Sequence, residues 1–210
     1  MSRPTLLLAS ASPRRAEILA QIGLPYRRAT MAAVNEDHPE PSPERLVRHL
    51  AELKCRAVIF DAEQPVPVAD TFVLGADTVV VIDGMILGKP RDASDAARMI
   101  AQLAGRRHRV FTGLALAEVI SDANGRASLG RMESLVASTE VNFASLDAAT
   151  IAAYVATGEP LDKAGAYGIQ GPGAMLIEGV VGEYYTVMGL SVRGLVELFA
   201  RFGRDLGELL

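Results

Sequence analysis

Apolar residues recur along the chain with two different periods, and these periods predict two kinds of element. Helical spacing of apolar side chains predicts helices over residues 13–22, 42–58, 94–103, 146–156 and 190–202. Short apolar runs predict strands over residues 5–9, 72–76, 78–82, 85–87, 110–119, 135–143, 175–177 and 184–187. Because strands and helices are interspersed, the sequence predicts an α/β fold with a mixed sheet.

Turn and cap residues sharpen several of these boundaries. Ser12 and Ser145 stand where the N-caps of two helices are expected, and Pro13 follows Ser12 at a first-turn position. Asp83 and Gly84 separate two apolar runs and predict a two-residue hairpin. Residues 30–41 and 157–173 predict loops, and the second of these is rich in glycine.

Composition narrows the class of protein. The chain has 210 residues, half of them apolar and 22% charged, which excludes general disorder. A single cysteine excludes a disulfide framework, and the three histidines lack metal-ligand spacing. A net charge of −4 argues against a broad nucleic-acid surface. No apolar run approaches the ~20 residues of a membrane span, so we expect a cytoplasmic protein.

Lysine is rare in this chain. Only Lys54, Lys89 and Lys163 occur among 21 basic residues, and the others are arginine. In a chain that otherwise uses arginine, a lysine can mark a position that needs a compact ammonium on a flexible side chain. The alternative is that the three lysines occur by chance. Lys89 and Lys163 lie in turns framed by glycine and proline, which favours the functional interpretation.

The first candidate site is the junction between the first strand and the first helix. Ser10, Ser12, Arg14 and Arg15 crowd a helix N-terminus, where free N–H groups and the helix dipole attract anions. Arginine also matches phosphate oxygens two at a time. The alternative is an ordinary cap with two solvated arginines.

The second candidate is Asp77, which stands among apolar residues. A buried carboxylate is costly unless it is paired, hydrogen-bonded or bound to a metal. Asp77 would then bind Mg²⁺ or accept a proton from water. The alternative is an aspartate that breaks the strand in a turn.

Further polar groups lie in three loops. Lys89 is held between Gly88 and Pro90, and Lys163 and Gln170 belong to the glycine-rich segment 157–173. The glycines there would let a ligand approach the backbone, and the Gln170 amide can read a base edge. Glu36 and Asp37 would add carboxylates, with solvated loop charge as the alternative.

Four segments together resemble the Maf family of nucleoside triphosphate pyrophosphatases. They are ASASPRR at residues 9–15, GADT at 75–78, GKPRD at 88–92 and LDKAGAYGIQG at 161–171. The resemblance implies one domain over residues 1–210. It also implies a mixed, elongated central β-sheet flanked by helices with an active-site cleft, as in Maf and inosine-triphosphatase-like proteins.

The same resemblance implies an activity and a set of roles. The enzyme would cut a nucleoside triphosphate between the α and β phosphates, give a monophosphate and pyrophosphate, need Mg²⁺ or Mn²⁺, and act as a homodimer. It implies Asp77 as proton acceptor and Arg14, Thr78 and Gln170 as specificity residues of the branch acting on dTTP and UTP. Non-standard pyrimidine nucleotides are further expected substrates. Combined with the candidate residues, this predicts phosphate binding by Ser10, Ser12, Arg15, Lys54, Lys89 and Lys163, and metal binding by Glu36 and Asp77.

Three other functions compete with this one. A non-catalytic nucleotide-binding regulator of cell division would use the same phosphate-binding turn, but would gain little from Asp77. A phosphomonoesterase would release orthophosphate instead of pyrophosphate. A nucleic-acid-binding module is disfavoured by the net charge and by 5% aromatic residues.

One departure from the family pattern lies in the loop after the first predicted helix, where an acidic pair is usual. Here Asn35 precedes Glu36 and Asp37. Glu36 is aligned with the family carboxylate, and Asp37 is the alternative.

Overall fold

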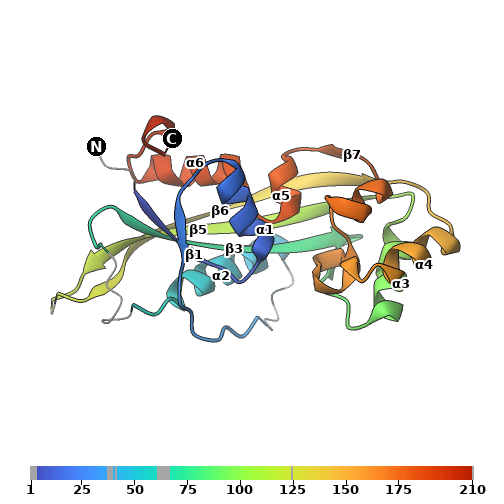
Figure 1. Cartoon of the computed structure of the whole chain (residues 1–210), viewed down its shortest axis with the longest axis horizontal. Helices are drawn as coiled ribbons and strands as arrows, with labels where there is room; N and C mark the ends of the chain where they lie inside the picture. The colour runs from blue at the N-terminus through green and yellow to red at the C-terminus, as the bar shows by residue number, and fades with distance from the viewer. Residues whose placement is uncertain (1–3, 37–39, 41, 61–66, 124, 210) are drawn as a thin grey trace. The chain divides into compact units, whose positions relative to one another are not determined.

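The chain has an α/β fold in which helices flank a mixed β-sheet, as the sequence predicts (Figure 1). The computed structural model describes residues 4–36, 40, 42–60, 67–123 and 125–209. Their strands are β1 (Thr5–Ala9), β2 (Tyr26–Arg28), β3 (Thr71–Ile82), β4 (Met85–Leu87), β5 (Arg107–Ser121), β6 (Ala127–Phe143) and β7 (Ile177–Val181). The α-helices are α1 (Pro13–Gln21), α2 (Pro43–Arg56), α3 (Ala93–Leu103), α4 (Ala148–Ala156), α5 (Tyr184–Met188), α6 (Val192–Arg201) and α7 (Leu206–Leu209).

The strands of the described residues form one sheet in the order β2-β1-β3-β5-β6-β7, and β4 pairs with β3. β1 runs parallel to both β2 and β3, whereas β4 is antiparallel to β3 and β7 is antiparallel to β6. The hairpin between β3 and β4 turns at Asp83 and Gly84, whose φ angles are 50° and 76°. Positive φ at both central residues is what a type I′ hairpin turn requires, so this predicted turn is confirmed.

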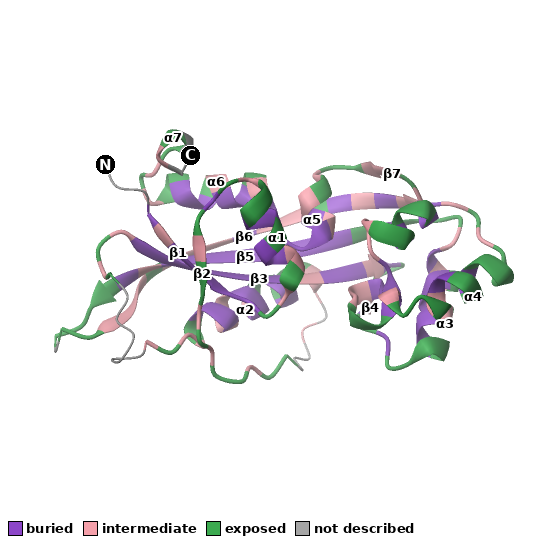
Figure 2. Cartoon of the chain, viewed as in Figure 1, coloured by how far each residue is buried: buried purple, intermediate pink, exposed green. Residues whose placement is uncertain are grey.

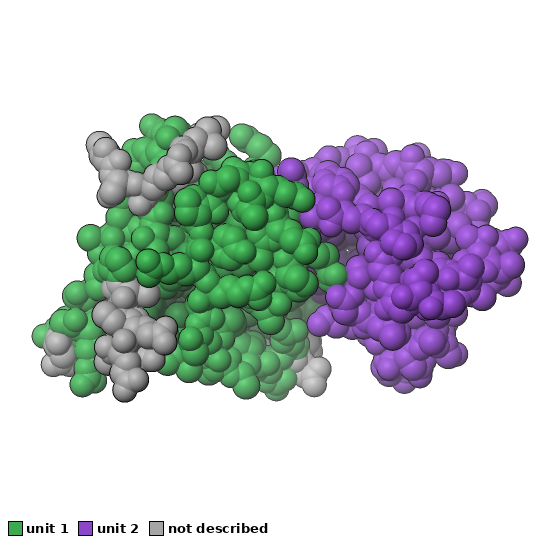
Figure 3. All heavy atoms as spheres, in the orientation of Figure 1, with its two compact units in different colours: residues 1–77, 112–137, 189–210 green, residues 78–111, 138–188 purple. Residues whose placement is uncertain are grey.

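The chain divides into two compact units (Figure 3). Unit 1 comprises residues 1–77, 112–137 and 189–210, and unit 2 comprises residues 78–111 and 138–188. β3, β5 and β6 each contribute residues to both units. The single domain expected over residues 1–210 stays a prediction.

In unit 1, helices cover both faces of the strands. Val73 and Phe72 are neighbours on β3, so their side chains point to opposite faces. Val73 belongs to a core cluster with Ala51 and Cys55 of α2, while the Phe72 ring packs edge-on against Phe199 of α6 at 5.3 Å between centroids. The buried positions of these elements stand out in Figure 2.

Unit 2 has a core of its own, built from α3, α4 and the strand ends that belong to it. Its centre includes three rings that contact one another edge-on: His108, Phe143 and Tyr167, with centroids 4.7–5.3 Å apart. The segment 157–176, expected as a loop over residues 157–173, instead contains three short 3-10 helices: η1 (Glu159–Asp162), η2 (Ala164–Ala166) and η3 (Gly171–Leu176).

Four local expectations are corrected by the structure. Residues 72–82 form one continuous strand, so Asp77 is inside β3 and does not break it. Residues 184–187 belong to the helix α5 rather than to a strand, and the strand expected at 175–177 begins only at Ile177. The fourth predicted helix begins at Ala148, and Asp147, not Ser145, caps it by accepting from the Thr150 N–H.

Two smaller elements lacked a sequence signal. β2 is three residues long, and α7 has four residues. Neither is long enough to show a period of hydrophobicity. Among the helices of the described residues, none combines the length and apolar character needed to cross a bilayer.

Candidate active site

Lys54 is the centre of a charged cluster in unit 1. Its Nζ lies 2.7 Å from Oδ1 of Asp77 and 2.8 Å from Oε1 of Glu36. The Lys54 and Asp77 side chains are only 10% and 11% exposed, whereas that of Glu36 is 55% exposed. A buried charge is stable only when it is paired, and this ammonium has one buried and one exposed carboxylate as partners.

The packing of α2 on the sheet brings Lys54 to Asp77. Gly75 and Asp77 are two residues apart on β3, so both face α2. A Cβ at Gly75 would lie 2.2 Å from the Ala51 carbonyl oxygen, and one at Gly113 would lie 2.2 Å from that of Val47. These two glycines therefore let α2 lie close against β3 and β5, and the side chain one turn after Ala51 then reaches the carboxylate.

Arg15 forms a second buried group in unit 1. Its Nε donates to the Gly189 carbonyl at 2.8 Å, and its Nη1 donates to Ser10 Oγ at 2.9 Å. Burial lowers the pKa of Arg15 from its ordinary value, and the negative charge of Asp77 counteracts this. The guanidinium is thus fixed by neutral acceptors from two ends of the chain and lies within the electrostatic range of Asp77.

The strand–helix junction has the local structure that the sequence predicts, with one difference. Ser12 is the N-cap of α1, yet its side chain makes no capping hydrogen bond; instead its backbone N–H donates to Ser10 Oγ at 3.2 Å. Arg14 is half-buried in the first turn of α1. The Ser12 hydroxyl is therefore not engaged in closing this helix end.

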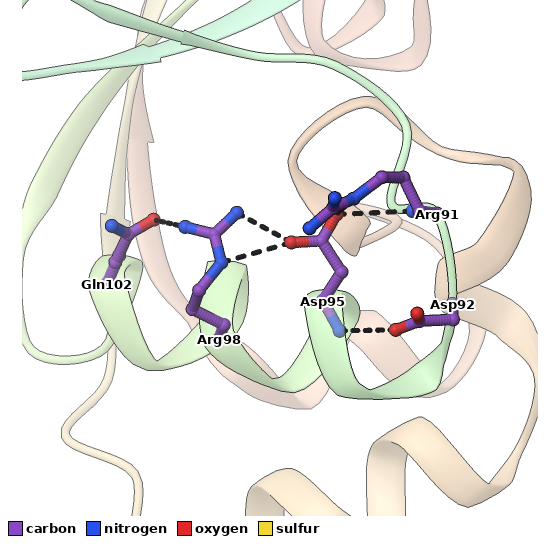
Figure 4. A network of polar contacts seen from close by, with 5 residues as sticks. All are labelled: Arg91, Asp92, Asp95, Arg98 and Gln102. Carbon is purple, nitrogen blue, oxygen red and sulfur yellow. Dashed lines mark hydrogen bonds and ion pairs between the residues drawn. The ribbon is translucent and has the colours of Figure 1, made fainter.

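The turn that carries Lys89 is held at both ends, and Figure 4 shows the contacts at its Arg91 end. At its start, the Gly165 N–H donates to the Gly88 carbonyl at 3.0 Å. At its end, the buried carboxylate of Asp95 accepts from the Arg91 N–H at 3.2 Å and from the Arg91 Nε at 3.1 Å. Lys89 itself is exposed between these anchors.

The Asp95 carboxylate is shared between two arginines, since Arg98 also donates to it, at 2.6 and 3.0 Å. These hydrogen bonds hold the pKa of Asp95 well below its usual range. Asp92 completes the network by capping α3 through the Asp95 N–H at 2.8 Å. The Lys89 turn is thus attached to a well-capped helix.

Unit 2 also holds the remaining predicted site residues. Lys163 Nζ donates to the Glu159 carbonyl and to Asp162 Oδ1, both at 2.7 Å. Gln170 is half-buried at the N-terminal boundary of η3, and Thr78 follows Asp77 directly on β3. Because Gly165 contacts Gly88, the segments carrying Lys89 and Lys163 are neighbours within this unit.

The structure therefore brings the predicted residues together as two groups. Ser10, Arg15, Glu36, Lys54 and Asp77 form the group in unit 1, and the Lys89 and Lys163 segments meet in unit 2. Asp37, the alternative to Glu36, lies outside the described residues.

The comparison with known families settles which family this chain represents. A family model described as Maf-like protein matches residues 5–202. The chain belongs to the Maf-like family.

Relatives of this Maf-like protein are similar over nearly their whole length. A protein of Moorella thermoacetica is 46% identical over 200 residues, which covers 95% of this chain and 96% of the relative. One of Symbiobacterium thermophilum is also 46% identical, covering 94% of both chains. One of Shigella sonnei is 42% identical over 198 residues, covering 94% of this chain and 93% of the relative. All three are named dTTP/UTP pyrophosphatase.

Sequence reasoning on this Maf-like protein gave no role to several residues that shape the candidate site. Gly189 supplies the carbonyl that holds Arg15, and Asp95 fixes the Lys89 turn. Glu159 and Tyr154 contact the glycine-rich segment by hydrogen bonds to Gly173 and Gly168. In the sequence, Glu159 shows only as a carboxylate at the start of a glycine-rich segment. This is a weak signal, because the group that it binds is a backbone N–H, which every residue except proline carries.

Proposed function

We propose that this protein hydrolyses nucleoside triphosphates between the α and β phosphates, releasing a nucleoside monophosphate and pyrophosphate, with dTTP and UTP as its main substrates. Membership of the Maf-like family and relatives named dTTP/UTP pyrophosphatase at 46% and 42% identity support this activity. The observation that carries it is the contact of the buried Lys54 ammonium with the buried Asp77 and the exposed Glu36, which places an ammonium and two carboxylates at one point.

The donor set at this point suits a divalent cation. Mg²⁺ is usually held by one or two carboxylates together with substrate phosphates. Glu36 and Asp77 supply two such carboxylates, and both lie within 2.8 Å of the same Lys54 Nζ. Among the described residues, no group of three or more histidines, cysteines or carboxylates lies close enough together to hold a metal ion. On the basis of these two carboxylates we assign Glu36 and Asp77 to Mg²⁺ or Mn²⁺, which would neutralise charge on the phosphates.

The residues of unit 1 would then prepare the attack. Asp77 accepts the proton of the water molecule that attacks the α phosphorus, which is a general-base role. Ser10, Ser12, Arg15 and Lys54 donate hydrogen bonds to the phosphate oxygens at the start of α1 and on α2. Fixed donors of this kind stabilise the charge that develops in the transition state without reorganising.

Lys89, Lys163 and Gln170 would bind the rest of the substrate. Lys89 and Lys163 stabilise the charge on the departing pyrophosphate. Gln170 reads the base, because its amide presents an acceptor to the N3–H and a donor to the O4 of uracil or thymine. Arg14 and Thr78 complete the specificity residues. Non-standard pyrimidine triphosphates that present the same N3–H and O4 groups are further substrates. We also propose that the enzyme is a homodimer and is cytoplasmic.

A panel of nucleoside triphosphates tests this function. Purified protein is incubated with dTTP, UTP, dCTP and dATP, with Mg²⁺, Mn²⁺ or EDTA, and pyrophosphate and orthophosphate are measured separately. We expect metal-dependent pyrophosphate release, fastest from dTTP and UTP. Binding of dTTP without turnover would instead indicate a nucleotide-binding regulator, and orthophosphate from a monophosphate would indicate a phosphomonoesterase.

A further inference from the structure

The stretch 167–173, which carries Gln170, is fastened within unit 2 by side chains that lie outside this stretch. The Gly168 N–H donates to the Tyr154 hydroxyl at 3.1 Å, and the Gly173 N–H donates to Glu159 Oε2 at 2.9 Å. The buried hydroxyl of Tyr167 lies 2.7 Å from His108 Nε2. Gln170 therefore lies between two fixed backbone groups. Gly168, two residues before it, is held by Tyr154 of α4, and Gly173, three residues after it, is held by Glu159 of η1.

The glycines of this segment make room for these two side chains. A Cβ at Gly168 or Gly171 would lie 3.0 or 3.1 Å from Oε1 of Glu159. One at Gly173 would lie 2.2 Å from the Gly168 carbonyl oxygen and 2.8 Å from the Tyr154 hydroxyl. The sequence suggested that the glycines let a ligand approach the backbone. The structure shows that Gly168 and Gly171 let the Glu159 carboxylate approach the backbone on both sides of Gln170, and that Gly173 lets the segment pack against its own Gly168 carbonyl.

A fixed backbone is what an amide needs in order to discriminate between pyrimidines. The Gln170 amide can present its oxygen and nitrogen in either order, since rotation by 180° about its last torsion exchanges them. One order complements uracil and thymine, and the reverse order complements cytosine. The order that the amide adopts depends on the groups around it, and these groups stay the same only while the backbone of Gln170 does not move. A glutamine on a mobile segment would therefore accept both bases, whereas one on a fixed backbone keeps one set of neighbours and favours one order.

We propose that Glu159, together with Tyr154, is the positioning residue that fixes Gln170 for the selection of thymine and uracil over cytosine. This inference rests on the proposed function, because it deepens the role of Gln170 in that reaction. Glu159 does not touch the base; it acts through the Gly173 N–H and the close contacts at Gly168 and Gly171.

The Glu159→Ala variant tests the proposal through substrate preference. The ratio of kcat/KM for dTTP to that for dCTP is measured by pyrophosphate release. We expect this ratio to fall about tenfold, within the range of a bidentate base contact. Truncation leaves the Glu159 carbonyl that binds Lys163 in place. Glu159→Gln keeps an oxygen for the Gly173 N–H, so we expect it to restore most of the ratio.

A matched control separates positioning from general loosening of this region. Asp147→Ala removes the N-cap of α4, the helix that leads into Glu159, and leaves the glycine-rich segment's contacts intact. We expect it to lower Tm without changing the dTTP-to-dCTP ratio. If Asp147→Ala shifts the ratio as much as Glu159→Ala does, or if Glu159→Ala lowers Tm and keeps the ratio, the proposal is overturned.

A double substitution tests whether Glu159 acts through Gln170. Gln170→Ala should lower the ratio, and adding Glu159→Ala should then change it no further, because coupled residues give non-additive effects. A further fall in the double variant contradicts this route. Tyr154→Phe, which removes the acceptor of the Gly168 N–H, replaces Glu159→Ala if that variant does not fold, with the same expected fall.

The outcomes also separate this inference from the proposed function. A wild-type protein that releases no pyrophosphate overturns both. A wild-type protein that prefers dTTP, with a preference that Gln170→Ala lowers and that neither Glu159→Ala nor Tyr154→Phe changes, overturns only the positioning role.

Discussion

The two units of this protein position their candidate site residues in different ways. In unit 1, Lys54, Asp77 and Arg15 are buried, and they are fixed by contacts between side chains or with a distant carbonyl. In unit 2, Lys89 is exposed, and hydrogen bonds to its turn's backbone hold the turn. Buried charges must be paired, so their position and the stability of the fold are linked. An exposed charge on a fixed turn is free of this requirement.

This contrast predicts different costs of substitution. Changes in the unit 1 cluster should lower activity and stability together. A change at Lys89, the exposed candidate site residue of unit 2, should lower activity alone, and changes in the neutral core of this unit should lower stability alone.

Asp77→Asn should have the largest effect on activity. Loss of a general base typically lowers the rate by about 10²–10⁴-fold. The unfolding free energy should also fall by about 1–3 kcal/mol, because asparagine leaves Lys54 without its buried charged partner. Pyrophosphate release from dTTP and urea unfolding measure the two effects. The control is Asp83→Asn, which changes only an exposed ion pair with Arg106 and should leave both the rate of pyrophosphate release and the unfolding free energy nearly unchanged. A fully active Asp77→Asn protein would exclude the base role.

Lys89→Ala should slow turnover with little change in stability. Loss of one partner of a charge pair typically costs about 2–5 kcal/mol of binding free energy. If Lys89 binds the transition state, this loss corresponds to a rate at least about 30-fold lower. The side chain is exposed, so the unfolding free energy should change by less than about 0.5 kcal/mol. Arg107→Ala removes another exposed cation of unit 2 and should leave turnover unchanged. Near-normal turnover of a folded Lys89→Ala protein would remove Lys89 from the mechanism.

His108 should make the fold sensitive to acid. Burial lowers its pKa from 6.5 to about 4. Below pH 6.5 the unfolded chain therefore binds a proton that the native protein does not bind, and stability falls as the pH falls toward 4. This shift corresponds to about 3 kcal/mol. Urea unfolding of the wild type and of His108→Gln between pH 7 and 4 measures it. The variant should show a shallower dependence, and equal slopes would contradict the assignment.

Ser12→Ala should have the smallest effect on stability. The Ser12 hydroxyl makes no capping bond, whereas Ser191 Oγ caps α6 by accepting from the Gly194 N–H at 2.8 Å. Thermal unfolding should therefore show a loss of about 1 kcal/mol for Ser191→Ala and less than about 0.5 kcal/mol for Ser12→Ala. Because we propose that the Ser12 hydroxyl binds phosphate, its removal should still raise the KM for dTTP roughly 2–10-fold. If Ser12→Ala and Ser191→Ala lower the unfolding free energy equally, Ser12 is a helix cap instead.

Much of the local structure could be predicted from the sequence, and the errors have physical causes. β1 has the predicted bounds, and the hairpin at Asp83 and Gly84 forms as expected. Residues 184–187 were predicted as a strand and form a helix, because a run this short does not distinguish the two periods. The sequence leaves a turn at Asp77 as the alternative; the structure instead continues β3 through Asp77, and Lys54 from α2 pairs with its buried carboxylate.

The sequence by itself determined the class of fold, the positions of most elements and the residues that carry charge in each candidate segment. These depend on short-range periodicity, caps and turn residues, which act within a few positions of the chain. Only the tertiary structure decided that Lys54 contacts Asp77 and Glu36, that Gly189 holds Arg15 and that Glu159 holds the Gln170 segment. Such contacts depend on how closely a helix can pack against a strand, and residues such as Gly75 and Gly113 set that distance through the absence of a side chain.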